Sequence, residues 1–105
     1  MMRKAKVYNF GIPAGELIEI ETGHKYKFVY FEHYSGKPIS LTMPVNQKEY
    51  EFNEFPPFFD GLLPEGVQLE ALIRQMKIDK NDFLSQLICV GKDLVGSVTI
   101  EEIKE

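Results

Sequence analysis

Two carboxylates, Asp60 and Glu65, come nearest in this 105-residue chain to a pair that could do acid–base chemistry. They stand five residues apart in a stretch rich in glycine and proline, where one could act as general acid and the other as general base. No histidine, nucleophile or phosphate-binding loop accompanies them. Turn formation and helix capping explain both residues more simply. An enzyme that uses them therefore stays a third hypothesis, and we assign no catalytic residue.

The histidines and the cysteine do not form a recognisable site either. His24 and His33 flank an expected strand, and no cysteine or regularly spaced carboxylate completes a metal site around them. Cys89 is the only cysteine and lies in an apolar run, where a buried structural thiol is the usual role. Residues 91–97 have the glycine spacing of a phosphate loop, but Ser97 stands where the lysine should be. We expect no metal, no cofactor and no enzymatic activity.

Length and charge limit the remaining classes of function. A chain of this size fits one domain, residues 1–105, and is too small for a substrate domain plus a cofactor domain. A net charge of −4 and a pI near 5.2 argue against a chain that binds nucleic acid directly. No apolar run approaches the roughly 18 to 20 residues of a membrane span, and no signal-peptide core follows the N-terminus. A cytoplasmic protein with no membrane contact is the simplest expectation.

The stretch that organises the chain is residues 55–66, FPPFFDGLLPEG. It places five large apolar side chains among residues that break regular structure, so something must cover it. Either the stretch is a rigid corner of the core, or part of it is an apolar patch that a partner covers. We expect Phe59, Leu62 or Leu63 to project, because one turn cannot bury all three. The candidate partner-binding residues are Phe58, Phe59, Asp60, Leu62, Leu63, Pro64 and Glu65.

Before this stretch, alternating patterns predict mainly strands. Residues 4–10 form a first strand, and residues 15–20 and 25–31 form a hairpin in which Gly23 supplies a turn with positive φ. The end of the strand over 25–31 is expected to be buried on both sides. Three further strands are predicted over 39–43, 50–52 and 95–100, and residues 101–105 read as a charged tail.

Two helices follow the organising stretch. Leu69, Leu72, Ile73 and Met76 recur with helical spacing, which predicts a helix from Pro64 or Gly66 to Met76. If that face is buried, the substitution Leu72→Ala should cost about 2–5 kcal/mol of stability.

The second helix begins after Asp79, which can cap it together with Asp82, and ends at Gly91. It carries Phe83, Leu84, Leu87 and Ile88 inward. The predicted fold class is α+β, a small mostly antiparallel sheet packed with two α-helices.

Three motifs in order make the sequence resemble a known family. They are PISLTMP at residues 38–44, PFFDGLLPEG at residues 57–66 and VGKDLVGSV at residues 90–98. Together they resemble the N-terminal subdomain of HipA-type serine/threonine kinase toxins. Gly15-Glu16-Leu17 and the Tyr26, Phe28, Tyr30 alternation are similar too, so the resemblance covers nearly the whole chain.

The resemblance implies a role in a toxin–antitoxin system. The nucleotide-binding and catalytic part of HipA kinases has no counterpart in this sequence. In this respect the chain is similar to the HipS antitoxin of tripartite HipBST systems. By that resemblance the chain would bind and neutralise a HipT-like kinase toxin, and a HipB-like DNA-binding protein could join the complex. The alternative is an N-terminal structural subdomain of a full-length HipA kinase. The chain has no tryptophan, so inhibition through a large indole would need Phe59, Leu62 or another residue instead.

Overall fold

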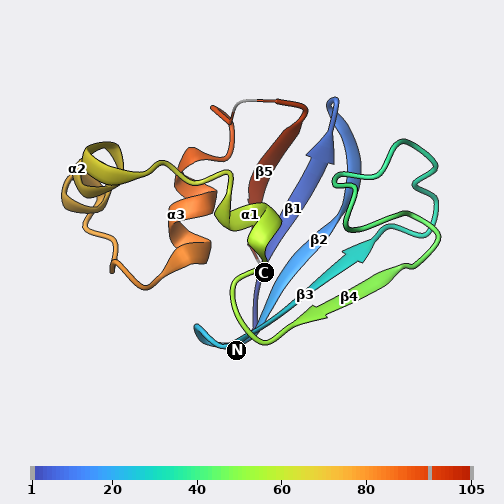
Figure 1. The fold of residues 1–105 in the computed structure, drawn as a ribbon, viewed down its shortest axis with the longest axis horizontal. Helices are drawn as coiled ribbons and strands as arrows, with labels where there is room; N and C mark the ends of the chain where they lie inside the picture. The colour runs from blue at the N-terminus through green and yellow to red at the C-terminus, as the bar shows by residue number, and fades with distance from the viewer. Residues whose placement is uncertain (1, 95, 105) are drawn as a thin grey trace.

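In the part of the chain that the structure describes, the protein is a five-stranded antiparallel sheet with three short helices, which confirms the predicted fold class (Figure 1). The structure is a computed structural model that describes residues 2–94 and 96–104. The strands run in the order β4-β3-β2-β1-β5. In chain order the elements are β1 (Arg3–Asn9), β2 (Ile12–Glu21), β3 (Lys25–Tyr30), β4 (Glu49–Phe52), α1 (Pro57–Asp60), α2 (Gly66–Met76), α3 (Phe83–Val90) and β5 (Val98–Ile103).

One face of the sheet carries the core. Alternate residues of the central strands are buried on the side of α1 and α3, and Tyr26, Phe28 and Tyr30 of β3 are among the largest of them. The opposite residues, including Lys6 and Lys27, are only half-buried. Gly23 closes the predicted turn between β2 and β3 with φ +73°. The alternation in the sequence therefore placed the core face correctly.

The predictions were wrong for one whole strand, for one strand's limits and for the burial of another. Residues 39–43 form turns and bends rather than a strand. The last strand runs over Val98–Ile103, so residues 101–103 belong to β5 and not to a tail, and Val95 lies outside the described residues. Val29 and Phe31 are only half-buried, because the helices cover just one face of the sheet. The expected burial on both sides of β3 is therefore not found.

Helix α3 packs against β5 and buries Leu84, Gln86 and Leu87 completely. Its N-cap is Asp82, whose carboxylate accepts a hydrogen bond from the Ser85 backbone N–H. The prediction that Asp79 caps this helix was wrong, because Asp79 instead accepts from the Asn81 backbone N–H in the preceding turn. A side chain that closes a local turn is not available to cap the next one.

Helix α2 has the predicted extent but lacks the predicted burial. It buries no side chain: Leu69, Leu72 and Ile73 are half-buried, and Met76 is about half exposed. In Figure 1 this helix lies beyond α3, on the side of the molecule away from the sheet. Helical spacing therefore gave the apolar face of α2 correctly, but the core does not cover that face. The large stability loss expected for Leu72→Ala no longer follows.

Candidate partner-binding site

The organising stretch folds into a tight corner around α1. Pro57 occupies the first turn of this four-residue helix, where its missing N–H costs no hydrogen bond. Successive turns then follow, in which the backbone N–H groups of Leu62 and Leu63 donate to the carbonyls of Phe59 and Asp60, both at 3.1 Å. The chain direction thus reverses within a few residues, and neighbouring side chains point in different directions.

Two aromatic side chains fix this corner to the sheet. The ring of Phe59 lies 5.8 Å from that of Phe28, between centroids, and Phe59 is fully buried. The Phe55 and Tyr26 rings form a T-shaped pair with 5.2 Å between their centroids. Buried aromatic pairs of this kind contribute about 0.5–1.5 kcal/mol beyond the area they bury. The corner is therefore part of the core on its inner side.

Of the three side chains among which we expected at least one to project, Phe59, Leu62 and Leu63, only Leu62 is partly exposed. Phe59 and Leu63 are buried, at 0% and 8% exposure, and support the corner from within. Phe58, Leu62 and Pro64 are half-buried, while Asp60 and Glu65 are exposed. The side chains that a partner could reach in this stretch are therefore these five.

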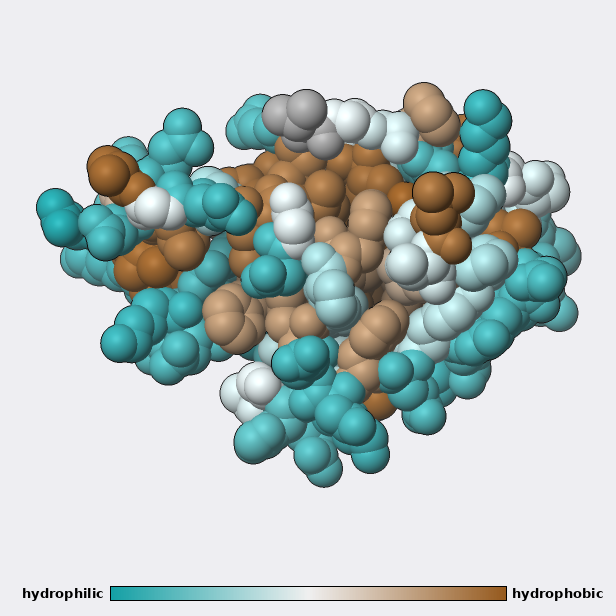
Figure 2. All heavy atoms as spheres, in the orientation of Figure 1, coloured by the Kyte–Doolittle hydropathy of each residue, from teal (hydrophilic) through white to brown (hydrophobic). Residues whose placement is uncertain are grey.

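A hollow lies on either side of α1. On one side, Leu62, Leu63 and Pro64 line a hollow of about 370 Å³ together with Val90 and Leu94 of the α3 end. On the other side is a hollow of about 200 Å³, lined by Thr42, Met43, Tyr50, Phe52, Pro57 and Phe58. Figure 2 shows apolar atoms gathered in the middle of this face, with hydrophilic atoms toward its margins. The corner thus presents an apolar centre that the chain leaves uncovered.

Leu41 is a surface residue that the sequence analysis missed. It is 95% exposed, although Ile39 and Met43 on either side of it are buried. The Tyr30 hydroxyl accepts from the Ile39 backbone N–H at 3.0 Å and donates to the Met43 carbonyl, and the Ser40 hydroxyl accepts from the Thr42 N–H. A strand here would have put Ile39, Leu41 and Met43 on one face, whereas these turns place Leu41 alone outside. Prolines at 38 and 44, with serine and threonine between them, were the available signal for turns.

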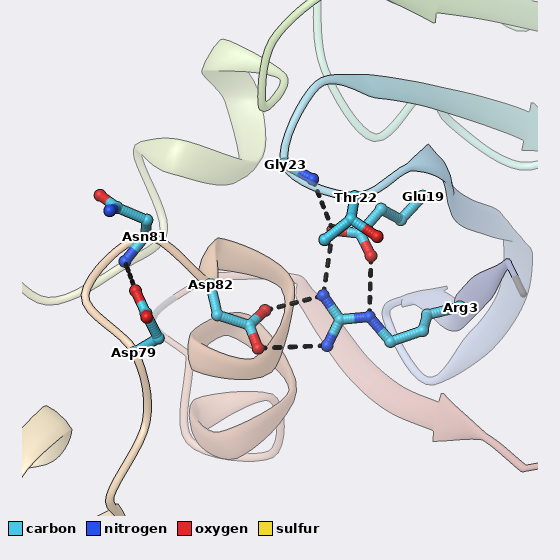
Figure 3. Close-up of a pocket in the computed structure, with 7 residues that line it drawn as sticks. All are labelled: Arg3, Glu19, Thr22, Gly23, Asp79, Asn81 and Asp82. Atoms are coloured by element: carbon cyan, nitrogen blue, oxygen red, sulfur yellow. Dashed lines mark hydrogen bonds and ion pairs between the residues drawn. The ribbon is translucent and has the colours of Figure 1, made fainter.

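A cluster of charged and polar side chains joins α3 to the sheet (Figure 3). The Arg3 guanidinium forms ion pairs at 2.8 Å with Glu19 of β2 and with Asp82 at the start of α3. It also donates to the Ser85 hydroxyl at 2.9 Å. The sequence analysis missed this cluster, although the strand alternation puts both Arg3 and Glu19 in phase with core residues. A charged side chain at a core-facing position requires a partner of opposite charge. The core-facing positions of Arg3 and Glu19 were therefore the available signal for an ion pair.

The protonation states of this cluster follow from its contacts. Hydrogen bonds from the Arg3 side chain to Glu19 and then to Asp82 raise the pKa of Arg3 above its usual range. Burial alone would raise the pKa of Asp82, but hydrogen bonds from Arg3 and Ser85 outweigh it and lower that pKa. Burial, followed by the nearby Glu19 charge, raises the pKa of Tyr26 to about 12. The cluster is thus a satisfied ion network in which charge holds elements together.

Within residues 2–94 and 96–104, no three histidine, cysteine or carboxylate side chains group in a way that could hold a metal ion. Over the same residues, no helix is long and apolar enough to cross a membrane. The class that the fold and the site define is a small α+β domain with an ion-paired end and an uncovered apolar corner.

Comparison with known proteins places the domain in a family. The sequence profile of the HipA N-terminal domain matches residues 5–101, and the chain belongs to the HipA N-terminal domain family. A solved structure of the N-terminal domain of HipA toxin is similar, with a TM-score of 0.76 and 27% identity over 98% of this chain and 94% of that one. An uncharacterized protein of Haemophilus influenzae is 31% identical over 105 residues, which cover 100% of this chain and 97% of that protein.

Proposed function

We propose that this chain is a non-enzymatic antitoxin that binds and neutralises a serine/threonine kinase toxin of the HipT or HipA type. The observation that carries the proposal is the similarity to the N-terminal domain of HipA toxin over nearly the full length of both chains. We expect a domain that occurs within a toxin to carry a surface that contacts the rest of that toxin. The Haemophilus influenzae relative, hardly longer than this chain, supports the idea that the domain also works as a separate protein.

The α1 corner is the surface on which we expect the kinase to dock. Its half-buried Phe58 and Leu62 lie beside two hollows, and the turns hold them in place. Little conformational entropy is lost when a partner covers such a rigid apolar surface, so truncation of an anchor there should cost about 1–2 kcal/mol of binding or more. A HipB-like DNA-binding protein is a further candidate member of the complex, because the acidic chain is poorly suited to bind DNA itself.

The same similarity favours one alternative, an N-terminal structural part of a longer HipA kinase. In that case the α1 corner would cover the kinase part of its own chain. The two proposals differ in whether the reading frame continues into a kinase sequence or a separate neighbouring gene encodes a kinase that lacks this domain.

The proposal is tested by co-purification with the neighbouring kinase and by a kinase assay with and without this chain. We expect a stable complex, loss of kinase activity and rescue of growth that the toxin has arrested. The variant Leu62→Asp should fold, as judged by circular dichroism and thermal melting, and should bind and rescue poorly. The control is Ile12→Asp, which replaces an exposed apolar residue of β2 outside the corner and should behave like the parent chain. If the folded Leu62→Asp variant rescues growth normally, the kinase contacts another surface of this chain.

The isolated chain should neither bind ATP tightly nor transfer phosphate. Phosphoryl transfer requires groups that hold the phosphates and Mg²⁺, and the sequence contains no phosphate-binding motif. Calorimetry with ATP and a radiolabel transfer assay check this expectation. Micromolar ATP affinity of the pure chain would contradict its role as a binding module.

A further inference from the structure

Charge is distributed unevenly along this chain, and the acidic part coincides with the α1 corner. Residues 49–73 contain six carboxylates and no lysine or arginine, so the rest of the chain carries a small positive excess. The six are all exposed: Glu49, Glu51, Glu54, Asp60, Glu65 and Glu70. Of these, Glu49 forms an ion pair with Lys27 at 3.2 Å. A block of one sign next to an apolar surface creates a field that acts on an approaching partner.

Three of these acidic residues, Glu51, Glu54 and Asp60, lie near the apolar hollow, whereas Glu49 is paired with Lys27. Phe52 and Pro57 line the 200 Å³ hollow and also a neighbouring one that Glu51 and Glu54 line. Asp60, one helical turn after Pro57, ends α1. In Figure 2, hydrophilic atoms stand below and to the sides of the apolar middle of this face. The corner therefore has an apolar centre and, beside it, an acidic rim made by Glu51, Glu54 and Asp60.

Leu41 adds a projecting apolar side chain to this face. Its neighbours Thr42 and Met43 line the 200 Å³ hollow, so the exposed leucine is adjacent in the chain to the wall of that hollow. The Tyr30 hydroxyl and the Ser40 turn hold the loop on both sides of it. A fully exposed leucine in a loop with fixed hydrogen bonds is suited to enter a pocket of another molecule, because little mobility remains to be lost.

We infer that the kinase surface that covers this corner is apolar at its centre and basic at its rim. Leu41 enters an apolar pocket of the kinase, and an apolar side chain of the kinase enters the 200 Å³ hollow. A second copy of this chain fits poorly, because two acidic rims would then face each other. The inference rests on the proposed function, since it describes the partner that function requires.

The basic rim is tested through the association rate of the full chain with the neighbouring HipT-type kinase. Raising the salt concentration from about 0.02 M to about 1 M shortens the screening length to about 3 Å and should slow association at least about tenfold. The double variant Glu54→Gln/Asp60→Asn should associate about three- to tenfold more slowly than the parent at low salt and depend less on salt. The control Glu16→Gln/Glu101→Gln removes two carboxylates from the opposite face of the sheet and should match the parent.

The apolar anchor is tested separately with Leu41→Ala. We expect about tenfold weaker affinity, mainly through faster dissociation, with an unchanged unfolding midpoint because the side chain is 95% exposed. Loop residue Asn46, which is also exposed, offers the control Asn46→Ala with parent-like binding.

The outcomes separate this inference from the proposed function. If the parent chain neither binds nor inhibits the kinase, the proposed function and this inference are both wrong. If the parent binds but the acidic double variant associates like the control, with the same salt dependence, the basic rim is wrong and the proposed function stands. Parent-like affinity of Leu41→Ala would likewise remove Leu41 from the interface.

Discussion

Helices α2 and α3 have similar sequence patterns and different surroundings. Both carry apolar residues at helical spacing, yet α3 buries Leu84, Gln86 and Leu87 while α2 buries nothing. The difference lies at their ends. Asp82 at the start of α3 is tied to Arg3 and through it to Glu19 of the sheet, whereas the residue before α2, Glu65, makes no side-chain cap. An amphipathic face thus shows that a helix has an apolar side, and here the helix whose start is ion-paired to the sheet is the one that the core covers.

The first prediction concerns the core of α3 and has the largest expected effect. The substitution Leu84→Ala should lower the free energy of unfolding by about 2–5 kcal/mol, because it leaves a cavity at a fully buried position between helix and sheet. Urea unfolding of parent and variant measures this difference. A loss below about 1 kcal/mol would mean that α3 is not fastened as described and would remove the contrast with α2.

The second prediction concerns the ion network. In Arg3→Met, Glu19 keeps its buried carboxylate, which is 4% exposed, but loses its cation. Removing one partner of a fully buried pair costs about 3–5 kcal/mol, and we expect about 1–3 kcal/mol here because the Arg3 side chain is 38% exposed. The matched control is Lys27→Met, which breaks a pair with the exposed Glu49 and should cost less than about 1 kcal/mol. Equal losses of unfolding free energy in the two variants would show that the Arg3 ion network contributes no more than an exposed ion pair.

The third prediction is the pH dependence of the same fastening. The pKa of Asp82 is lowered in the folded chain, so its charged form is favoured by folding. Its contribution to stability is therefore present above the unfolded pKa and is lost as the pH falls through the folded pKa. Between about pH 5 and pH 2, the unfolding midpoint in urea should fall further for the parent than for Asp82→Asn. Parallel curves for the two proteins would show that Asp82 does not contribute.

The smallest expected effect is in α2. The substitution Leu72→Ala should cost about 1 kcal/mol or less, because the side chain is only half-buried in the free chain. Val67→Ala, at a position that is 80% exposed, is the control and should change stability by less than about 0.5 kcal/mol. Unfolding measurements on the isolated chain check both values. A loss for Leu72→Ala as large as that for Leu84→Ala would show that α2 is closed onto the core in solution.

The sequence by itself determined the fold class and most elements of this protein. Alternation placed Tyr26, Phe28 and Tyr30 on the core side of a hairpin, and Gly23 marked its turn. Helical spacing placed α2 and α3 to within a few residues. These features are local: side chains of a strand alternate every two residues and those of a helix recur every three or four, so each can be read from neighbouring positions. The acidic block over residues 49–73 was equally readable.

Only the tertiary structure decided which apolar residues remain outside. The corner of residues 55–66 was recognised as special, but Phe59 turned inward onto Phe28, and Leu41, from a stretch predicted as a strand, turned outward. Both outcomes depend on contacts between residues far apart in the sequence: the Phe28 ring, and the Tyr30 hydroxyl that holds the loop around Leu41. The Arg3 pairs with Glu19 and Asp82 join positions 16 and 79 residues apart. Pairing across such distances requires the register of the sheet and the position of α3, which no local pattern contains.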